Sequence, residues 1–452
     1  MVVFDKVLIA NRGEIAVRVI RACRELGVRT VAVYSEADAD SSHVELADEA
    51  VCVGPAQPRR SYLNVPNIVG AALKTGAQAV HPGYGFLSED PDFARICADN
   101  GLTFIGPSPE VMSSVGDKAT ARKLMAGAGL PMLPGSAEPV ASYEEAAAYA
   151  ESIGYPIVVK AVAGGGGRGI AIVESAAGLR TAYRRTRAGA QAVFGDSRVY
   201  VERYAASVRH IEFQILADAH GRIVHLGERD CSVQRRHQKL IEEGPSPALD
   251  PVLRNEMGQA ALSGAKAVGY QGAGTVEFLL DDDGRFWFME MNARIQVEHP
   301  VTEMITGVDL VTEQIKVAAG ERLSFDQSDV TLNGHAIECR VNAENPDRDF
   351  APTPGKLLEY RVPGGFGVRV DTHSVPGGTV PPHYDSMIAK LITWAPDRRA
   401  ALARMDSALA EMRVSGPGVH TTIGFHRRVL ADPVFAAGQA RTSFLAKEFE
   451  AG

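Results

Sequence analysis

The sequence has few cysteines, and their arrangement argues against the usual structural roles of that residue. There are five, an odd number, they lie far apart, and no Cys-x-x-Cys pair occurs. This spacing disfavours both a zinc site and a disulfide framework. No run of about 18 apolar residues is present, and Asp5 and Lys6 interrupt the N-terminus before a signal sequence could form. We therefore expect a soluble, cytoplasmic protein with no membrane partner.

An excess of positive charge is also lacking. The 47 Lys and Arg residues against 55 Asp and Glu give a net charge of −8. This balance argues against a bulk electrostatic grip on nucleic acid, although local basic pockets are possible. The 452 residues correspond to about three domains of roughly 150 residues each. A hydrophobic fraction of 45% and a charged fraction of 23% are those of a globular protein.

The N-terminal region predicts a βαβ unit. Residues 2–10 indicate a buried strand, residues 15–27 an amphipathic helix and residues 28–35 a second strand. The turn after the first strand has only Gly13 in place of G-x-G-x-x-G, so a nicotinamide dinucleotide is not expected. Strand-like segments that end in Gly/Pro turns continue the α/β pattern to about residue 112.

A second region runs from about Asp117 to Gly320, and a third, of mixed strands and helices, begins near Asn333. Within the second, residues 163–170 form a glycine-rich loop directly after a strand that contains Lys160. Bare backbone N–H groups can approach phosphates closely. The loop lacks the G-K-[ST] ending of a P-loop, so Lys160 would supply the cation. A hinge that binds no ligand is the alternative.

Two alternating strands flank an Asp-Asp-Asp-Gly turn at residues 281–284, which predicts a hairpin. A two-residue turn places Glu277 opposite Glu290, whereas a four-residue loop places them diagonally on one face. Like charges across a ladder need neutralising. A divalent cation would do so, with Asn292 completing an all-oxygen set suited to Mg²⁺ or Mn²⁺. A solvated acidic face is the alternative.

The same period of two continues beyond Asn292. If the chain stays extended, Arg294, Gln296 and Glu298 line the metal side, with Ile295 and Val297 opposite. Glu298 is then a candidate general base, and Arg294 offers a fork for a carboxylate or carbonate. A structural ion pair is the simpler interpretation.

The segment 229–239 is strongly basic for an acidic protein. It is either a solvated surface loop or an anion pocket, and it contains Arg229, Arg235, Arg236, His237 and Lys239. Other positions indicate no role when taken singly: Tyr84, Gly85, Lys118, His210, Arg340 and Glu202 to Ala205.

Taken together, ANRGEIAVR, HPGYGFLSED, GDK, the glycine-rich loop, ERDCSVQRRHQK, MEMNARIQVEHPVTE and PPHYDSMIAKLI resemble biotin carboxylase in order and spacing over nearly the entire chain. The resemblance implies α/β and α+β architecture in three parts. These are a Rossmann-like N-terminal domain (1–112), an ATP-grasp domain (118–320) with a mobile lid at about 131–205, and an α+β C-terminal domain (333–445).

The resemblance also implies a reaction of ATP, bicarbonate and biotin, with two Mg²⁺ or Mn²⁺ ions and a homodimer. No Ala-Met-Lys-Met sequence occurs, so we expect the biotin on a separate carrier protein, with carboxyltransferase subunits as further partners. The acyl acceptor, acetyl-CoA or another, stays open. The alternatives are another ATP-grasp ligase, which would not need Arg340 or Tyr84, and a nucleotide-binding scaffold, which would not need Glu298.

Residue roles carry over from the family position by position. The nucleotide-contacting positions are Lys118, Lys160, Gly166, Gly167, Glu202, Arg203, Tyr204, Ala205, His210, Gln234, His237, Glu277 and Glu290. The metal ligands are Glu277, Glu290 and Asn292. The bicarbonate and biotin positions are Lys239, Arg294, Gln296, Val297, Glu298, Arg340, Tyr84 and Gly85, of which Lys239, Arg294, Glu298 and Arg340 are catalytic. The segment 416–426 departs most from the family pattern.

Overall fold

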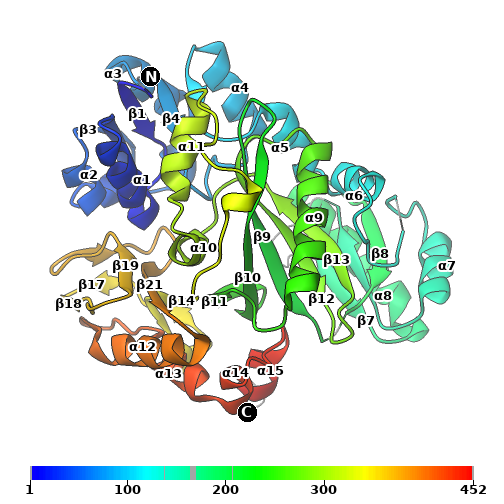
Figure 1. The fold of residues 1–452 in the computed structure, drawn as a ribbon. Helices are drawn as coiled ribbons and strands as arrows, with labels where there is room; N and C mark the ends of the chain where they lie inside the picture. Colours follow the sequence, from blue (N-terminus) through cyan, green and yellow to red (C-terminus); the bar gives the residue numbers. More distant parts are fainter. Residues whose placement is uncertain (1–2, 137, 163–168, 206, 450–452) are drawn as a thin grey trace.

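The computed structural model describes residues 3–136, 138–162, 169–205 and 207–449. Figure 1 shows an N-terminal sheet in blue, a long central sheet in green to orange, and a smaller unit beside it. Within the described residues no helix is long and apolar enough to cross a membrane.

The N-terminal region is a parallel five-stranded sheet of order β3-β2-β1-β4-β5. Alternate residues of β1 pack into two different cores, Val7 and Ile9 into one and Leu8 into the other. The sheet is therefore buried on both faces, as its apolar sequence predicts. Its elements are β1 Lys6–Ile9, α1 Gly13–Glu25, β2 Arg29–Ser35, α2 Ser42–Leu46, β3 Glu49–Gly54, α3 Val65–Thr75, β4 Ala79–His81, α4 Pro91–Asp99, β5 Thr103–Phe104 and α5 Pro109–Gly116.

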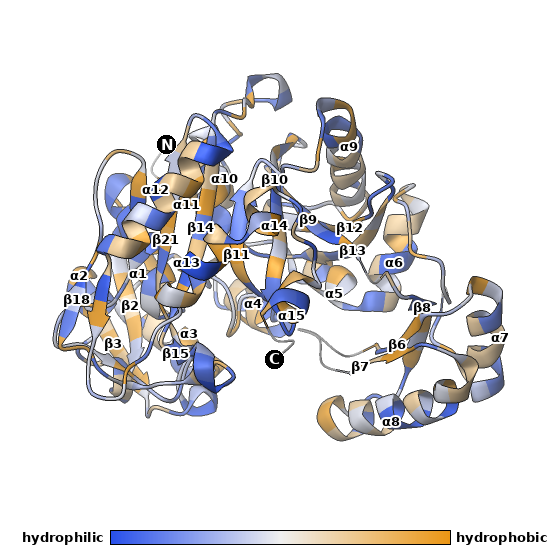
Figure 2. Cartoon of the chain, turned by 90° about the horizontal axis from the view of Figure 1, so that it is seen from below, coloured by the Kyte–Doolittle hydropathy of each residue, from blue (hydrophilic) through white to orange (hydrophobic). Residues whose placement is uncertain are grey.

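The next helix begins where the sequence predicts. The Asp117 carboxylate accepts a hydrogen bond from the Thr120 N–H and so caps α6 (Lys118–Gly127). A small antiparallel sheet of order β7-β6-β8 follows, with a hydrophobic core of its own. Its elements are α7 Tyr143–Ile153, β6 Ile157–Ala161, β7 Ile170–Val173, α8 Ala176–Phe194 and β8 Val199–Arg203. Seen from below, this unit stands apart from the rest of the chain (Figure 2).

The central sheet has eight strands in the order β13-β12-β9-β10-β11-β14-β21-β19. It joins the second and third sequence regions, because β11 pairs with β14. Its elements and covering helices are β9 Arg209–Ala217, β10 Ile223–Arg235, β11 Gln238–Gly244, α9 Pro251–Ala267, β12 Gly272–Leu280, β13 Phe286–Asn292, α10 His299–Thr306, α11 Leu310–Ala318, β14 His335–Asn342, β19 Val368–Thr372, β21 Met387–Ala395 and α12 Arg398–Glu411.

The remaining elements are short and complete the C-terminal region. They are β15 Glu344–Asn345, β16 Ala351–Pro352, β17 Gly355–Lys356, β18 Glu359–Arg361, β20 Thr379–Val380, β22 Arg413–Ser415, α13 Ile423–Ala431, α14 Pro433–Ala436 and α15 Phe444–Glu448. The predicted combination of α/β and α+β architecture is confirmed.

Candidate active site

The β12–β13 hairpin places Glu277 opposite Glu290, as the two-residue turn predicts, but by another route. Phe278 pairs with Phe288, so Met289 is an extra residue on β13, a β-bulge. The loop is closed by the Asp281 N–H donating to the Arg285 carbonyl at 2.9 Å. Both expected turns are therefore wrong. A three-residue loop ending in left-handed Gly284 (φ 78°) combines with the bulge to give the predicted pairing.

Carboxylates form a row across the sheet, because Glu212 on β9 is the register partner of Glu277. Glu277 accepts hydrogen bonds from Asn292 Nδ2 and Gln296 Nε2, both at 2.8 Å. Burial alone would raise the pKa of Glu277, but Lys239 and His210 together hold it well below its usual range. Burial and the charge of Glu277 raise the pKa of Glu290. The pKa values of the two facing carboxyl groups are therefore shifted in opposite directions.

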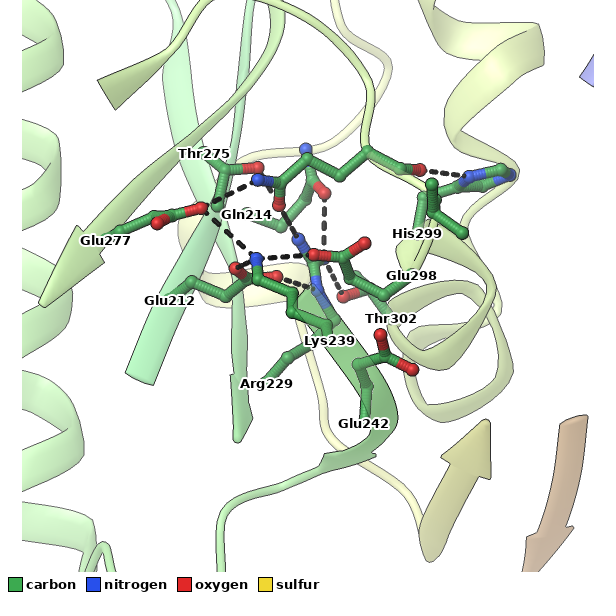
Figure 3. Close-up of polar contacts among 12 residues, drawn as sticks. Glu212, Gln214, Arg229, Lys239, Glu242, Thr275, Glu277, Glu298, His299 and Thr302 are labelled. Carbon is green, nitrogen blue, oxygen red and sulfur yellow. Dashed lines mark hydrogen bonds and ion pairs between the residues drawn. The ribbon is translucent and has the colours of Figure 1, made fainter. Parts of the chain in front are cut away.

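Lys239 lies at the centre of the site (Figure 3). Its Nζ is 2.5 Å from Glu212, 2.6 Å from Glu298 and 3.2 Å from Glu277. Burial alone would lower the pKa of Lys239, but these carboxylates raise it well above its usual value. The side chain is therefore a permanent cation that joins three strands and a helix terminus.

The strand position of Lys239 depends on a second bulge. The β10–β11 hairpin turns through Arg236 and His237, both at positive φ (48° and 64°), a two-residue turn of the I′ kind. Gln234 pairs with Lys239 and Val233 with Ile241, so Leu240 is the extra residue. The bulge reverses the alternation of β11, and Lys239 points into the site.

The basic segment forms the β10–β11 hairpin, in which Arg229 is buried while Arg236 and His237 at the turn are exposed. The Arg229 side chain is 0% exposed. It donates to Glu212 Oε1 at 2.6 Å and to Gln296 Oε1 at 2.9 Å, and it also bonds Gln214 and Thr302. Arg229 thus holds the side chains of Glu212 and Gln296 in place through these hydrogen bonds. The sequence placed Arg229 in a possible anion pocket but did not predict these contacts with protein side chains.

Glu212 was also missed, although the sequence carries a signal for it. In β9 the polar residues His210, Glu212 and Gln214 alternate with the apolar residues of one core. All three are buried. Three successive polar residues on one covered face of a strand indicate a polar site inside the protein.

The segment after Asn292 is not extended, which corrects the expected alternation. β13 ends at Asn292, and Glu298 occupies the N-cap position of α10. Arg294 still lies beside Asn292, because its Nη2 donates to Asn292 Oδ1 at 3.0 Å, while its Nε donates to Glu89 at 2.9 Å. Gln296 and Glu298 nevertheless converge on the Glu277–Lys239 centre. The chain turns before α10 begins, and this turn brings the two side chains to the site. A strand-like alternation of residues cannot predict such a turn.

Glu298 is held between two cations. Lys239 Nζ donates to Oε1 at 2.6 Å and Arg340 Nη2 to Oε2 at 2.8 Å. Burial alone would raise the pKa of Glu298, but Lys239 and Arg340 lower it well below its usual range. Arg340 Nε also donates to Glu242 at 2.7 Å. The carboxylate is ionised at neutral pH, as a proton acceptor must be.

Three of the predicted nucleotide-contacting side chains lie near one another, and Lys118 also lies near the acidic hairpin. Burial lowers the pKa of Lys118, with Glu290 and Lys160 as the main charges acting on it. Burial and Lys160 lower the pKa of His237. Lys160 itself donates to Glu202 at 2.6 Å. The structure therefore brings these side chains together, with Lys160 engaged by a carboxylate.

The other predicted positions are more peripheral. Arg203 is exposed and donates to the Ile153 carbonyl, and Tyr204 N–H donates to Pro156. Tyr84 donates to Glu14, and its ring lies 6.0 Å from Lys390 Nζ. That lysine also donates to the Val297 carbonyl at 2.8 Å. Gly85 and Ala205 lie in loops, while Gly166 and Gly167 are outside the described residues.

Comparison with protein families agrees with this arrangement. Residues 3–112 match "Biotin carboxylase, N-terminal domain", residues 117–325 "Carbamoyl-phosphate synthase L chain, ATP binding domain" and residues 338–447 "Biotin carboxylase C-terminal domain". The fold and the carboxylate-rich site define an ATP-grasp ligase of the carboxylase class.

Individual relatives narrow this class. The chain is 56% identical to the biotin carboxylase of Nostoc sp. over 98% of both chains. It is 53% identical to a subunit of pyruvate carboxylase from Methanothermobacter thermautotrophicus over 98% of this chain and 89% of that one. A biotin carboxylase from Campylobacter jejuni, solved with a β-γ-ATP compound, superposes with a TM-score of 0.96 at 47% identity, covering 98% and 99% of the two chains. The chain belongs to the biotin carboxylase family, which confirms the resemblance.

Proposed function

We propose that this protein carboxylates the biotin of a separate carrier protein, using ATP and bicarbonate and passing through carboxyphosphate. The observation that carries the proposal is Glu298, an ionised carboxylate held between Lys239 and Arg340 beside the acidic hairpin. A related biotin carboxylase domain from Hydrogenobacter thermophilus, 50% identical, was solved with MgADP and bicarbonate. These are the ligands that such a reaction requires.

The donor set of the hairpin fits a hard divalent cation. Glu277, Glu290 and Asn292 are buried or nearly so and offer oxygen ligands only. We assign them the binding of two Mg²⁺ or Mn²⁺ ions together with the nucleotide phosphates. A divalent cation there would neutralise charge on the phosphate oxygens. Its presence would also relieve the repulsion that raises the pKa of Glu290.

The nucleotide would bind between the small sheet and the central sheet. Lys118 lies near Glu290 of the hairpin, Lys160 and His237 lie near each other, and we assign all three to the phosphates. Glu202 to Ala205 include the end of β8 in the small sheet, and we assign this segment to the adenine. The remaining assigned contacts are His210, Gln234, Gly166 and Gly167. The lid is proposed to be the unit 131–205, because its hydrophobic core is separate.

The first chemical step takes place at Glu298. Bicarbonate would lie against Arg294, Gln296, the Val297 backbone and Lys239, and Glu298 accepts its proton. A bicarbonate oxygen then forms a bond to the γ-phosphorus as the bond to ADP breaks, which yields carboxyphosphate. Lys239 and Lys160 stabilise the negative charge that develops on the transferring group.

The second step uses Arg340. Carboxyphosphate separates into CO₂ and phosphate, and the phosphate accepts the ureido proton of biotin. The biotin N1′ then forms the bond to CO₂ while Arg340 stabilises the enolate oxygen. Tyr84 and Gly85 would lie beside the biotin ring. Exclusion of water matters in both steps, because carboxyphosphate hydrolyses.

We further propose that the three parts of the chain, 1–112, 118–320 and 333–445, act together in a cytoplasmic homodimer that serves a biotin carboxyl carrier protein and a carboxyltransferase. The Hydrogenobacter relative is described as a dimer and as part of a 2-oxoglutarate carboxylase. The Methanothermobacter relative, of similar identity, is named for pyruvate instead. Acetyl-CoA or another acyl-CoA is our proposed final acceptor.

The test measures phosphate release from ATP and Mg²⁺, with and without bicarbonate and free biotin. We expect release that requires bicarbonate and increases with biotin, and loss of both activities in Glu298→Gln. Release indifferent to bicarbonate and biotin would instead favour another ligase or a scaffold. Glu313→Gln is a matched control, because that buried glutamate pairs with Lys316 on α11, outside the site.

A further inference from the structure

Two glutamates with no part in the proposed reaction face each other beside Arg340. Glu242 on β11 and Glu338 on β14 are direct register partners. Both side chains are 0% exposed. Directly opposite residues have Cβ atoms about 4.5–5.5 Å apart, and like charges at that separation are destabilising. Two buried, ionised carboxylates in this position would therefore be costly.

The hydrogen bonds around the pair are unequal. Arg340 Nε donates to Glu242 Oε1 at 2.7 Å. The second oxygen of Glu242 and both oxygens of Glu338 have no hydrogen-bond partner among the described residues. Lys390, the cation that acts most strongly on Glu338, is engaged elsewhere, by the Val297 carbonyl at 2.8 Å and Glu14 at 3.0 Å. Among the described residues, Lys390 therefore does not supply the missing hydrogen bonds of these three oxygens.

Charged and titratable groups approach the pair from every neighbouring element. They are Lys239 on β11, Cys339 and Arg340 on β14, Lys390 on β21, Cys231 on β10 and Glu298 before α10. Burial raises the pKa of Glu242 to about 7, with Glu298 opposing the effect of Arg340. Burial and Glu242 raise the pKa of Glu338 well above its usual range. Burial also raises the pKa of the Cys231 thiol, which is therefore neutral.

We propose that Glu242 and Glu338 hold one proton between them at neutral pH, and that this pair positions Arg340 against Glu298. With one proton, Glu338 can donate to the second oxygen of Glu242, and Glu242 keeps the single negative charge that anchors Arg340 Nε. The other end of the guanidinium then stays directed at Glu298. Glu338 is thus a positioning residue, and its importance for catalysis rests on the proposed function.

Loss of that proton would change the electrostatic attraction that acts on the Arg340 guanidinium. A second carboxylate charge would attract the guanidinium toward the sheet, away from Glu298 and from biotin. Full protonation would remove the anchor instead. A single shared proton gives the second oxygen of Glu242 a donor and keeps the negative charge that anchors Arg340.

Infrared difference spectroscopy tests the proton directly, without substrates. Wild type at neutral pH should show the carbonyl stretch of a protonated carboxylic acid that Glu338→Gln lacks. Glu243→Gln is the matched control, because Glu243 follows Glu242 on β11 but accepts from His335 at 2.8 Å and Arg398 at 2.6 Å, which lower its pKa against burial. That variant should keep the band. A band identical in wild type and Glu338→Gln would overturn the shared proton, whether or not the proposed function holds.

The positioning role is tested by the pH dependence of biotin carboxylation. Glu338→Gln cannot ionise, so the alkaline decline in kcat should move to higher pH, by about one unit or more. Glu242→Gln should lower kcat for biotin carboxylation more than bicarbonate-dependent ATP cleavage. An unchanged alkaline decline in Glu338→Gln would overturn the role. Wild type without any bicarbonate-dependent ATP cleavage would contradict the proposed function instead, and would leave the infrared result standing.

Thermal unfolding supplies a reading that does not depend on activity. A carboxyl group whose pKa is raised by folding stabilises the protein below its unfolded pKa of about 4.3, and that stability is lost as pH rises through the folded pKa. The Tm of wild type should therefore fall relative to that of Glu338→Gln as pH rises above the unfolded pKa of about 4.3. A difference that stays constant with pH would contradict a raised pKa at Glu338.

Discussion

The two hairpins of the central sheet carry opposite charges, and both use a β-bulge to direct a charged side chain into the site. The β12–β13 hairpin supplies Glu277 and Glu290, and the β10–β11 hairpin supplies Lys239, with β9 between them. Both contain a bulged residue, Met289 in the first and Leu240 in the second, and the second has a further register shift between Asp230 and Val233. The bulges decide which face each charge occupies. If the side chains of both hairpins alternated regularly from one face to the other, Lys239 and the carboxylates of the acidic hairpin would not all lie on the same face of the sheet.

Replacement of Glu290 should have the largest effect on this arrangement. Glu290→Gln removes one of the two facing carboxylates that we assign to the divalent cation. We expect bicarbonate-dependent ATP cleavage to fall below detection, while circular dichroism shows the sheet retained. Met289→Ala changes the neighbouring bulged residue and serves as the control. Full activity in Glu290→Gln would mean that Glu290 is not a metal ligand.

Replacement of Lys239 tests the other hairpin. Lys239→Met leaves three buried carboxylates without their shared cation, so the free energy of unfolding should fall by about 3–5 kcal/mol. Urea unfolding measures this. Lys316→Met removes an intrahelical pair that is a third exposed on its lysine side, and it should cost about 0.5 kcal/mol or less. Similar losses in the two variants would show that the charges at the centre are not coupled.

Arg340→Ala should separate the two halves of the reaction. Its proposed part follows carboxyphosphate formation, so biotin carboxylation should fall by about 100-fold or more. Bicarbonate-dependent ATP cleavage should fall less, by about tenfold, because Glu298 keeps Lys239. Both rates are measured on one preparation. Equal losses would place Arg340 in the first step.

The smallest effect concerns acid stability. The pKa of Glu298 is lowered by folding, so its contribution to stability is present above the unfolded pKa of about 4.3 and is lost as pH falls below it. The free energy of unfolding of Glu298→Gln should therefore decline less steeply between about pH 5 and pH 3 than that of wild type. Parallel declines would indicate that Lys239 and Arg340 do not stabilise the ionised form.

Much of this architecture follows from the sequence, and the exceptions share a cause. The βαβ start, the helix cap at Asp117 and the pairing of Glu277 with Glu290 are predicted by local patterns. The bulges, the turn at 293–298 and the engagement of Arg294 by Glu89 are not, because each depends on contacts between distant segments. Glu212 and Arg229 were missed for a related reason. Their importance appears only when strands β9, β10 and β12 lie side by side.

The most direct test of the proposed chemistry follows one oxygen atom. If Glu298 activates bicarbonate for attack on the γ-phosphorus, a bicarbonate oxygen must remain on the phosphate when carboxyphosphate separates. Turnover with ¹⁸O-labelled bicarbonate, ATP and biotin, followed by mass analysis of the phosphate, measures it. We predict one bicarbonate-derived oxygen in each phosphate released. Phosphate free of label, with carboxybiotin still formed, would contradict the account.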